Sequence, residues 1–242
     1  MNRAMFAAAS GMAAQQTNLE IIADNLANAD VAGFKGAAAS FAAVAAGGSL
    51  GLGTTTLGRH TVFEQGKLMK SGGPFDLAID GTGFFHVLKG KNHAFTRAGE
   101  FHRAPDGSLQ NAAGWRLAGI RVPADALNGV VESNGGIFVD TASRSHQPAG
   151  RIRLAAFASP EALRALGGAL FTATDASGPP RTFDAGGEGG PSIVFGMLEK
   201  SNVSIVESMM QILTAQRAYE ANAKGVQAAD EMLRIANNLH RG

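Results

Sequence analysis

The chain has 242 residues, of which 45% are apolar, and its formal net charge at pH 7 is +1. This length and apolar content predict one large or two small domains with a real core. The near-neutral charge gives no general reason to expect nucleic acid or anionic lipid as a partner. Because Cys is absent, the sequence excludes disulfides, thiolate metal sites and a Cys nucleophile.

The first thirty residues carry mostly apolar side chains at alternating steps of three and four, which is the pattern of a heptad seam on a helix. The members of this seam are Met5, Ala8, Met12, Gln15, Leu19, Ile22, Leu26 and Ala29. Asn28, Asp30 and Gly33 interrupt the pattern and predict the end of the helix. The Ala-rich stretch after Arg3 leaves a cleaved secretory signal as an alternative. The seam continues through the cleavage point, which favours a mature helix.

The last forty residues carry a second seam of the same kind. Its members are Ile212, Ala215, Tyr219, Asn222, Val226, Ala229, Leu233 and Ala236. A helix over residues 203–239 would be roughly 55 Å long, which a globular domain of this size rarely needs. Two long terminal seams predict that the end helices pair. A separate apolar edge at Val206, Met210 and Leu213 predicts a further neighbour for the C-terminal helix.

Composition separates the middle of the chain from both ends, because all 8 Pro and 27 of the 32 Gly lie within residues 37–197. Residues 37–61 are small, Gly-rich and weakly patterned, so we expect a loose connector. From residue 62 the period changes to two, as in Phe75, Leu77 and Ile79, which predicts short antiparallel strands separated by turns. We expect a short helix at 160–166 and an exposed loop at 175–190.

The fold class that follows is α+β, with long N- and C-terminal helices pairing as a coiled-coil layer and a central, mostly antiparallel β domain. The predicted domains are an N-terminal axial helix (1–36), a connector (37–61), the β domain (62–197) and a C-terminal axial helix (198–242).

No group of residues predicts catalysis, a cofactor or a metal. Asp76 and Asp80 precede Gly81 and Gly83, but a turn between two strands explains them better than a carboxylate pair or a phosphate loop, because a strand follows and no third Gly is present. The six His are scattered without helical metal-ligand spacing. We therefore expect no enzyme activity and no cofactor.

Several motifs resemble bacterial flagellar rod and hook proteins, in that family's order along the chain. At the N-terminus these are residues 11–18, 22–28 and Gly33-Phe34-Lys35, and at the C-terminus Leu198-Glu199-Lys200-Ser201-Asn202-Val203 and residues 216–222. In the middle, residues 76–85 and Phe95-Thr96-Arg97-Ala98-Gly99-Glu100-Phe101 are similar to the family's β-domain motifs.

The resemblance implies a structural subunit of the flagellar basal-body rod that assembles as a helical homo-oligomer. It also implies export by the flagellar type III apparatus without a cleaved signal. The implied partners are neighbouring rod proteins and the hook protein, with flagellar ring proteins as further candidates, and neither nucleic acid nor a small-molecule substrate. The end signatures most resemble the distal rod protein, whereas the chain length suits the proximal one. A short hook protein, a secreted β-domain enzyme or binding protein, and a peripheral membrane protein remain alternatives.

The assembly residues are expected in the two seams and the second edge. Helix packing is predicted for Met12, Leu19, Ile22, Leu26, Val206, Met210, Leu213, Tyr219, Val226 and Leu233. Asn25, Asn28 and Gln216 are expected to supply polar contacts that set the alignment of the helices, since a polar residue in a seam specifies register. Gly33 is expected to supply backbone freedom where the chain leaves the helix.

Overall fold

The structure is a computed structural model that describes residues 3–44, 52–123, 126–141, 145–187 and 190–239. The chain forms two compact units. Unit 1 comprises residues 1–27, 37–62 and 203–242, and unit 2 comprises residues 28–36 and 63–202. The chain therefore passes between the units four times.

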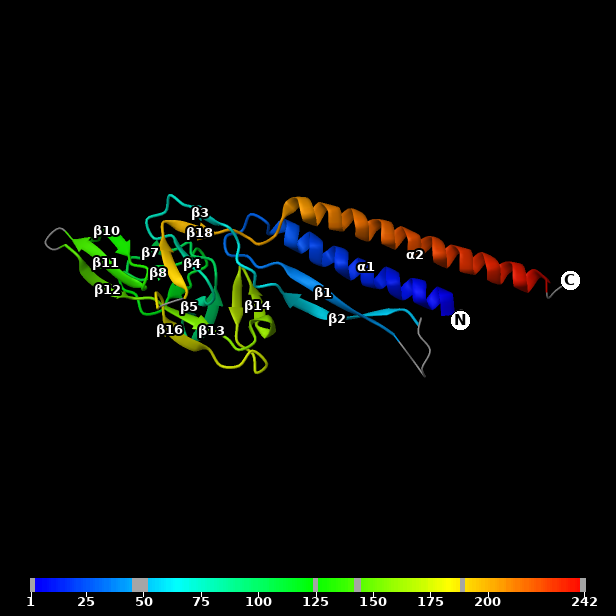
Figure 1. Ribbon diagram of the computed structural model, residues 1–242, viewed down its shortest axis with the longest axis horizontal. Helices are drawn as coiled ribbons and strands as arrows, with labels where there is room; N and C mark the ends of the chain where they lie inside the picture. Colours follow the sequence, from blue (N-terminus) through cyan, green and yellow to red (C-terminus); the bar gives the residue numbers. More distant parts are fainter. Residues whose placement is uncertain (1–2, 45–51, 124–125, 142–144, 188–189, 240–242) are drawn as a thin grey trace. The chain divides into compact units, whose positions relative to one another are not determined.

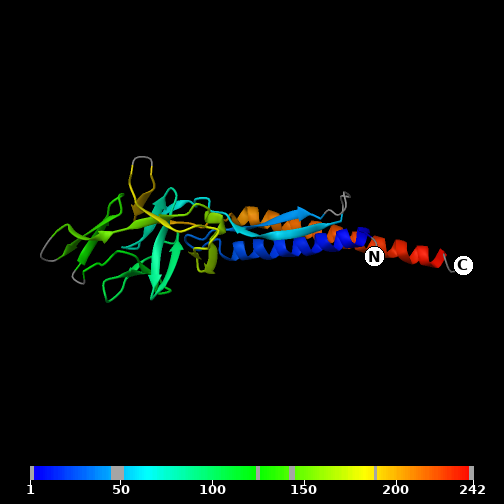
Figure 2. The same ribbon diagram turned by 90° about the horizontal axis from the view of Figure 1, so that it is seen from below.

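Unit 1 consists of two long helices and two strands, α1 (Arg3–Ala27), β1 (Ala37–Ala43), β2 (Thr54–Thr61) and α2 (Ile205–Leu239). The two helices lie side by side and run antiparallel, and α1 also contacts both strands (Figures 1 and 2). The first turn of α2 is held by a hydrogen bond in which the Glu207 N–H donates to Ser204 Oγ at 3.4 Å. A side-chain oxygen ahead of a helix commonly satisfies such an N–H.

Small residues bring α1 and α2 close together. A Cβ added at Gly11 would lie 2.9 Å from Asn222 Nδ2, and one added at Gly225 would lie 3.8 Å from the Ala8 Cβ. These two pairs define the alignment of the antiparallel helices, in which Gly11 lies opposite Asn222 and Ala8 lies opposite Gly225. Arg3 is therefore level with about residue 230, since both helices rise 1.5 Å per residue. The last turns of α2 continue past the described start of α1 (Figure 1).

Residues 37–61 do not form the loose connector expected from their composition. β1 and β2 pair antiparallel from Ala37 opposite Thr61 to Ala43 opposite Thr54, with an irregularity between Ser40 and Phe41. The small Ala side chains of β1 give little β signal on their own. Their pairing with the Thr-rich β2 and their packing on α1 account for the strands.

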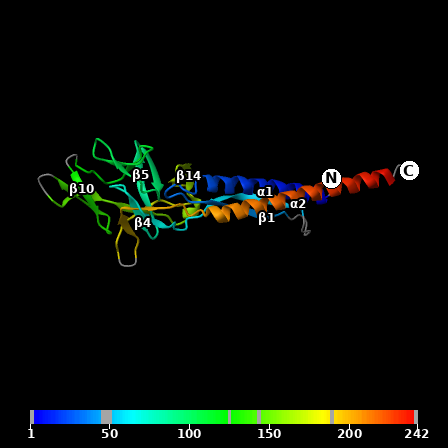
Figure 3. The same ribbon diagram turned by 90° about the horizontal axis from the view of Figure 1, so that it is seen from above.

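Unit 2 is built from short strands whose pairings are all antiparallel. The main sheet has the order β14-β15-β6-β5-β9-β8-β7, and β13 joins β5 to β16. A three-stranded sheet β10-β11-β12 lies at the opposite end of unit 2 from β14, and two further pairs are β17-β4 and β18-β3 (Figures 1 and 3). The bounds are β3 Leu68–Lys70, β4 Leu77–Asp80, β5 Phe84–Lys89, β6 Asn92–Thr96, β7 His102–Arg103, β8 Leu109–Gln110, β9 Arg116–Leu117, β10 Ala126–Val131, β11 Gly136–Thr141, β12 Gln147–Arg151, β13 Arg153–Ala156, β14 Arg164–Gly167, β15 Leu170–Thr172, β16 Arg181–Asp184, β17 Ser192–Phe195 and β18 Met197–Glu199.

The alternating pattern of the middle therefore predicts the strand class correctly, with two errors. The helix expected at 160–166 is a single 3-10 turn at Pro160–Ala162, after which Arg164–Gly167 is strand β14. Residues 175–190 are not all loop, because Arg181–Asp184 pairs with β13. In both places pairing with another strand overrides the local signal, and that strand is the adjacent β15 for β14 and the distant β13 for β16.

Apolar side chains from both sides of the main sheet form the core of unit 2. One cluster includes the fully buried Leu77, Ile79, Phe85, Val87 and Leu154. A second is aromatic and joins Phe63, Phe84, Phe95, Phe157 and Phe171. The chain is thus α+β, as expected. The expected N-terminal axial helix covers residues 1–36. In the structure α1 ends at Ala27, and residues 28–36 belong to unit 2.

Candidate assembly site

The start of α2 carries a stripe of exposed apolar side chains. Val206, Met210 and Leu213 are 69%, 58% and 56% exposed, and Met209 is exposed beside them. We call these four residues the α2 stripe. A continuous apolar stripe on a helix normally faces another surface.

Val206, Met209 and Leu213 lie on the side of α2 opposite from α1. Met210 lies at the flank, where it lines a groove together with residues of α1. A helix turns about 100° per residue, which places Val206 and Leu213 roughly half a turn from Ser208 and Ala215. Ser208 and Ala215 are buried, whereas the stripe is not. A groove of about 450 Å³ runs between the helices, lined by Gln15, Asn18, Glu207, Met210, Gln211, Thr214, Ala215 and Ala218. Met210 therefore belongs to both the stripe and the rim of the groove.

The seam residues of α1 are covered to different degrees. Ile22 is buried, and Met12, Leu19 and Leu26 are half-buried. These positions fit the expected contact between the terminal helices.

The second seam is less covered than its pattern predicts. Val226 is half-buried, but Tyr219 and Leu233 are exposed. Leu233 follows residue 230, beyond the described start of α1, so α1 offers it no surface. Tyr219 lies at the flank of the contact, because a helix of 3.6 residues per turn drifts away from a strict seven-residue repeat.

The polar residues of the seams behave differently from one another. Gln216 is exposed, so it is not the buried seam contact expected from its position. The carbonyl oxygen of Asn28 accepts a hydrogen bond from the Val31 N–H at 3.2 Å, in the turn after α1.

The side chain of Asn25 makes two hydrogen bonds to the backbone of Ala37. Its Oδ1 accepts the Ala37 N–H at 2.8 Å, and its Nδ2 donates to the Ala37 carbonyl at 2.7 Å. Asn25 therefore aligns α1 with the first residue of β1 rather than with α2.

Replacing Asn25 with Ala should destabilise unit 1 by about 1–3 kcal/mol, because Ala37 is buried and both of its backbone groups would lose their partner. Urea unfolding followed by circular dichroism at 222 nm measures this loss, since both long helices belong to unit 1. Asn25→Asp keeps the bond to the N–H and should fall between Ala and wild type. Equal stability of Asn25→Ala and wild type would show that water replaces both bonds.

Gly33 lies in the segment of unit 2 that follows α1. Its φ is +66°, a left-handed conformation that glycine adopts without steric cost. Its N–H donates to the Glu199 carbonyl at 2.7 Å. A Cβ at this position would lie 2.2 Å from the Ala98 nitrogen. Gly33 is therefore required both for its conformation and for the close approach of the Ala98 backbone.

Two residues after Gly33, the chain enters a buried cluster of charges in unit 2. Glu199 lies between two cations, with Oε1 2.5 Å from Lys35 Nζ and Oε2 3.2 Å from Arg97 Nη1. Glu199 is 0% exposed, Lys35 is 3% exposed and Arg97 is 5% exposed. We call Lys35, Arg97 and Glu199 the ion cluster.

Backbone groups complete the hydrogen bonding of the ion cluster. Lys35 Nζ donates to the Glu64 carbonyl at 2.6 Å, and Arg97 Nη2 donates to the Gly81 carbonyl at 2.7 Å. Glu199 Oε1 also accepts the Gly66 N–H at 2.9 Å. Burial lowers the pKa of Lys35 and Arg97, and the charge of Glu199 opposes that effect. The single carboxylate therefore offsets part of the desolvation of both cations.

The ion cluster joins the segments through which the chain leaves unit 2. Residues 28–36, 63–66 and 199–202 each adjoin a crossing to unit 1. Besides the bonds above, the Gly36 N–H donates to Asn202 Oδ1 at 2.8 Å, and the Lys200 N–H donates to the Lys67 carbonyl at 2.9 Å. These contacts tie together chain segments from both ends of the sequence.

Sequence patterns do not identify the ion cluster. Lys35, Arg97 and Glu199 each belong to one of the three groups of motifs that resemble flagellar proteins. Two of these motifs carry a second charged residue, Glu100 and Lys200, so the sequence does not indicate which of the charges are buried.

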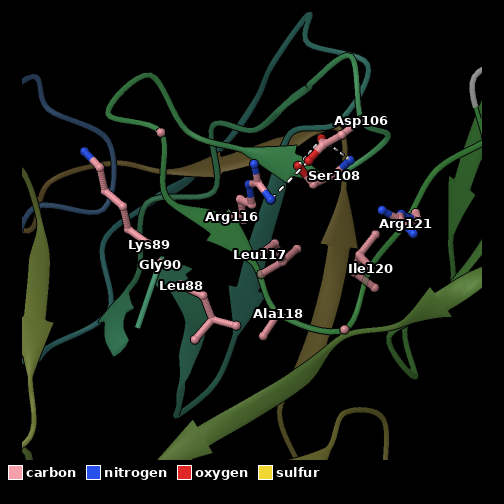
Figure 4. Close-up of a pocket in the computed structure, with 12 residues that line it drawn as sticks. Leu88, Lys89, Gly90, Asp106, Ser108, Arg116, Leu117, Ala118, Ile120 and Arg121 are labelled. Carbon is pink, nitrogen blue, oxygen red and sulfur yellow. Dashed lines mark hydrogen bonds and ion pairs between the residues drawn. The ribbon is translucent and has the colours of Figure 1, made fainter. Parts of the chain in front are cut away.

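A pocket of about 510 Å³ in unit 2 is lined by four ionisable residues, Lys89, Asp106, Arg116 and Arg121 (Figure 4). Asp106 lies 3.1 Å from Arg116 and accepts hydrogen bonds from the Ser108 hydroxyl and N–H. The Ser108 bonds hold the pKa of Asp106 below its usual range, and the charges of Arg116 and Arg121 add to this. A general acid needs a raised pKa, so Asp106 is not suited to that role.

In the described part of the chain, no three His, Asp or Glu side chains gather in a way that could hold a metal ion. None of the described helices is both long and apolar enough to cross a membrane.

Three family models match the chain in the order of its elements. Residues 5–35 match "Flagella basal body rod protein", and residues 78–139 match "Flagellar hook protein FlgE/F/G D1 domain". Residues 195–239 match "Flagellar basal body rod FlgEFG protein C-terminal". The matched segments include α1, most of the strands from β4 to β11, and α2.

Full-length relatives agree with these models. The flagellar basal-body rod protein FlgG of Borreliella burgdorferi is 38% identical over 100% of both chains. FlgG of Agrobacterium fabrum is 35% identical over 97% of this chain and 98% of that protein. The flagellar basal-body rod protein FlgF of Caulobacter vibrioides is 32% identical over 98% of this chain and 97% of its own length. This chain therefore belongs to the FlgG and FlgF family of flagellar basal-body rod proteins, and it is a structural subunit of the rod.

Proposed function

We propose that this subunit assembles helically with further copies of itself, through α1 and α2. In this arrangement the two helices pair as a coiled-coil layer along the axis of the rod, and the β domain (62–197) faces outward. The residues expected to carry the contacts are the seam and edge residues, with the α2 stripe as the surface that meets a neighbouring copy.

The α2 stripe is the observation that supports this proposal. Val206, Met210 and Leu213 are more than half exposed although α1 packs on the same helix, because α1 reaches only the flank of this stripe, at Met210. A contact between unlike surfaces does not close on itself and so extends into a helical array. Leu233, near the C-terminal end of α2, lies on the other face of the helix, in line with Ala215, so a different neighbouring copy would cover it.

Neighbouring rod proteins and the hook protein are the further partners that we propose, and the flagellar ring proteins are additional candidates. These assignments follow from the family. The same basis supports a location in the rod of the flagellar basal body and export by the flagellar type III apparatus.

We also propose that no signal peptide is removed. The stretch that cleavage would take away contributes to unit 1, because Ser10 Oγ accepts the Thr54 N–H at 3.0 Å and Gly11 packs against Asn222. Cleavage would therefore remove contacts of α1 with both β2 and α2.

Sedimentation of the purified full-length chain tests the proposal. Wild type should form polymers that pellet, whereas Met210→Glu combined with Leu213→Glu should remain monomeric. Both side chains are exposed in the single chain and Glu favours helix, so the fold should be preserved. Circular dichroism verifies this point.

The swap Met210→Leu with Leu213→Met keeps the stripe apolar and is the matched control. It should sediment as wild type does. If the Glu variant polymerises at the wild-type concentration, the α2 stripe is not the assembly surface. If wild type itself stays monomeric at every concentration, self-assembly through the helices is wrong.

A further inference from the structure

We propose that the thioethers of Met209 and Met210 form an oxidation site, at which peroxide-type oxidants block assembly of the subunit. This inference rests on the proposed function, because it requires that a second copy covers the α2 stripe. It adds a chemical control to that surface.

The inference is based on which methionines are exposed in the described part of the chain. Four of them are exposed there, and three of these four, Met209, Met210 and Met232, lie on α2. Met5, Met12 and Met197 are half-buried. Met209 and Met210 are adjacent and belong to the α2 stripe, so an oxidant in solution reaches both sulfur atoms before assembly.

The chain contains no competing thiol. Because Cys is absent from the sequence, methionine is its only sulfur-containing residue. Thioethers react with two-electron oxidants to give methionine sulfoxide, and reductases can reverse the reaction. Solvent-exposed Met on α2 should therefore be among the first side chains to be modified.

The reaction with hydrogen peroxide is balanced at one sulfur. A sulfur lone pair attacks one peroxide oxygen, the O–O bond breaks and an S–O bond forms. Sulfur loses two electrons and peroxide is reduced. The second oxygen leaves as water, after it takes up the proton released by the oxygen that binds sulfur. The product replaces an apolar thioether with a polar sulfoxide.

The effect should fall on assembly and not on the fold of the single chain. Met209 is 53% exposed, and Met210, at the rim of the groove beside α1, is 58% exposed, so a sulfoxide at either position stays hydrated in the monomer. Burial of the same sulfoxide against a neighbouring copy strips water from its oxygen, which is unfavourable without a hydrogen-bond partner. We expect the concentration needed for polymerisation to rise roughly tenfold or more. Subunits already assembled should resist oxidation, because the neighbour covers the stripe.

The experiment treats the full-length monomer with hydrogen peroxide, identifies each oxidised Met by peptide mass spectrometry, and measures polymerisation by sedimentation. Met209 and Met210 should be oxidised, and polymerisation should then be lost and return after treatment with methionine sulfoxide reductases. Met209→Leu combined with Met210→Leu should polymerise with or without peroxide.

Met69 is the matched control, because it is 47% exposed on β3 of unit 2, compared with 53% for Met209. Met69→Leu should leave the peroxide sensitivity unchanged. The inference is overturned if the oxidised wild type still polymerises, or if the Leu variant of both α2 residues loses polymerisation on oxidation as wild type does. A failure of the untreated protein to polymerise would instead count against the proposed function.

Discussion

Replacing Glu199 with Gln should destabilise unit 2 by about 3–5 kcal/mol, the usual cost of removing one partner from a buried ion pair. The substitution leaves Lys35 and Arg97 buried with no anion between them. Gln is close to Glu in shape, so the loss reports the missing charge and not a cavity. Because the free energy of unfolding of a domain is about 5–15 kcal/mol, this single change should remove a large part of it.

The chain provides its own probe for this measurement. Trp115 is the only Trp in the sequence and packs against the core of unit 2, so its fluorescence in a urea titration follows unit 2 alone. Asp184→Asn is the control, since Asp184 pairs with Arg151 and Arg153 while half-exposed to solvent. Exposed pairs contribute about 0–1 kcal/mol. Similar losses for Glu199→Gln and Asp184→Asn would contradict the role given to the ion cluster.

A further variant separates the charges of the cluster from its packing. Lys35→Met, Arg97→Met and Glu199→Leu together replace all three charges with apolar side chains. Buried ion clusters can often be replaced in this way with little loss of stability or even a gain. The triple variant should therefore be more stable than Glu199→Gln alone.

Sequence patterns predict elements whose signal is local. The steps of three and four predict both long helices, and the alternation around Leu77 and Ile79 predicts β4. The exposed second edge at Val206, Met210 and Leu213 is also predicted from spacing alone. These features need no knowledge of which distant residues meet.

The ion cluster shows why the rest could not be predicted. Lys35 and Glu199 are 164 positions apart, and Arg97 and Glu199 are 102 apart. Charged residues are rarely fully buried unless they are paired, so each one alone is best interpreted as a surface residue. Only the fold brings the three together. For the same reason the Ala-rich β1 is missed, because its partner β2 and the surface of α1 determine its conformation.

Replacing Gly33 with Ala is expected to destabilise unit 2 strongly. Two costs add at this position. A non-Gly residue in the left-handed region costs about 1–2 kcal/mol. The new Cβ would also lie 2.2 Å from the Ala98 nitrogen and 2.4 Å from the Arg97 carbonyl carbon. Both are backbone atoms, which cannot move aside as a flexible side chain does, so the segments that carry the ion cluster must separate.

Comparison with Gly90→Ala separates the steric cost of Gly33→Ala from its conformational cost. Gly90 has nearly the same φ, +63°, but an added Cβ would meet nothing within 4 Å. Gly90→Ala should therefore show only the conformational cost, while Gly33→Ala should lose at least twice as much in the Trp115 titration. Equal losses would mean that residues 28–36 can shift without disturbing unit 2. A larger loss for Gly33→Ala would instead show that the chain leaving α1 is a structural part of unit 2, and that its fit against Ala98 sets the geometry in which Lys35 reaches Glu199.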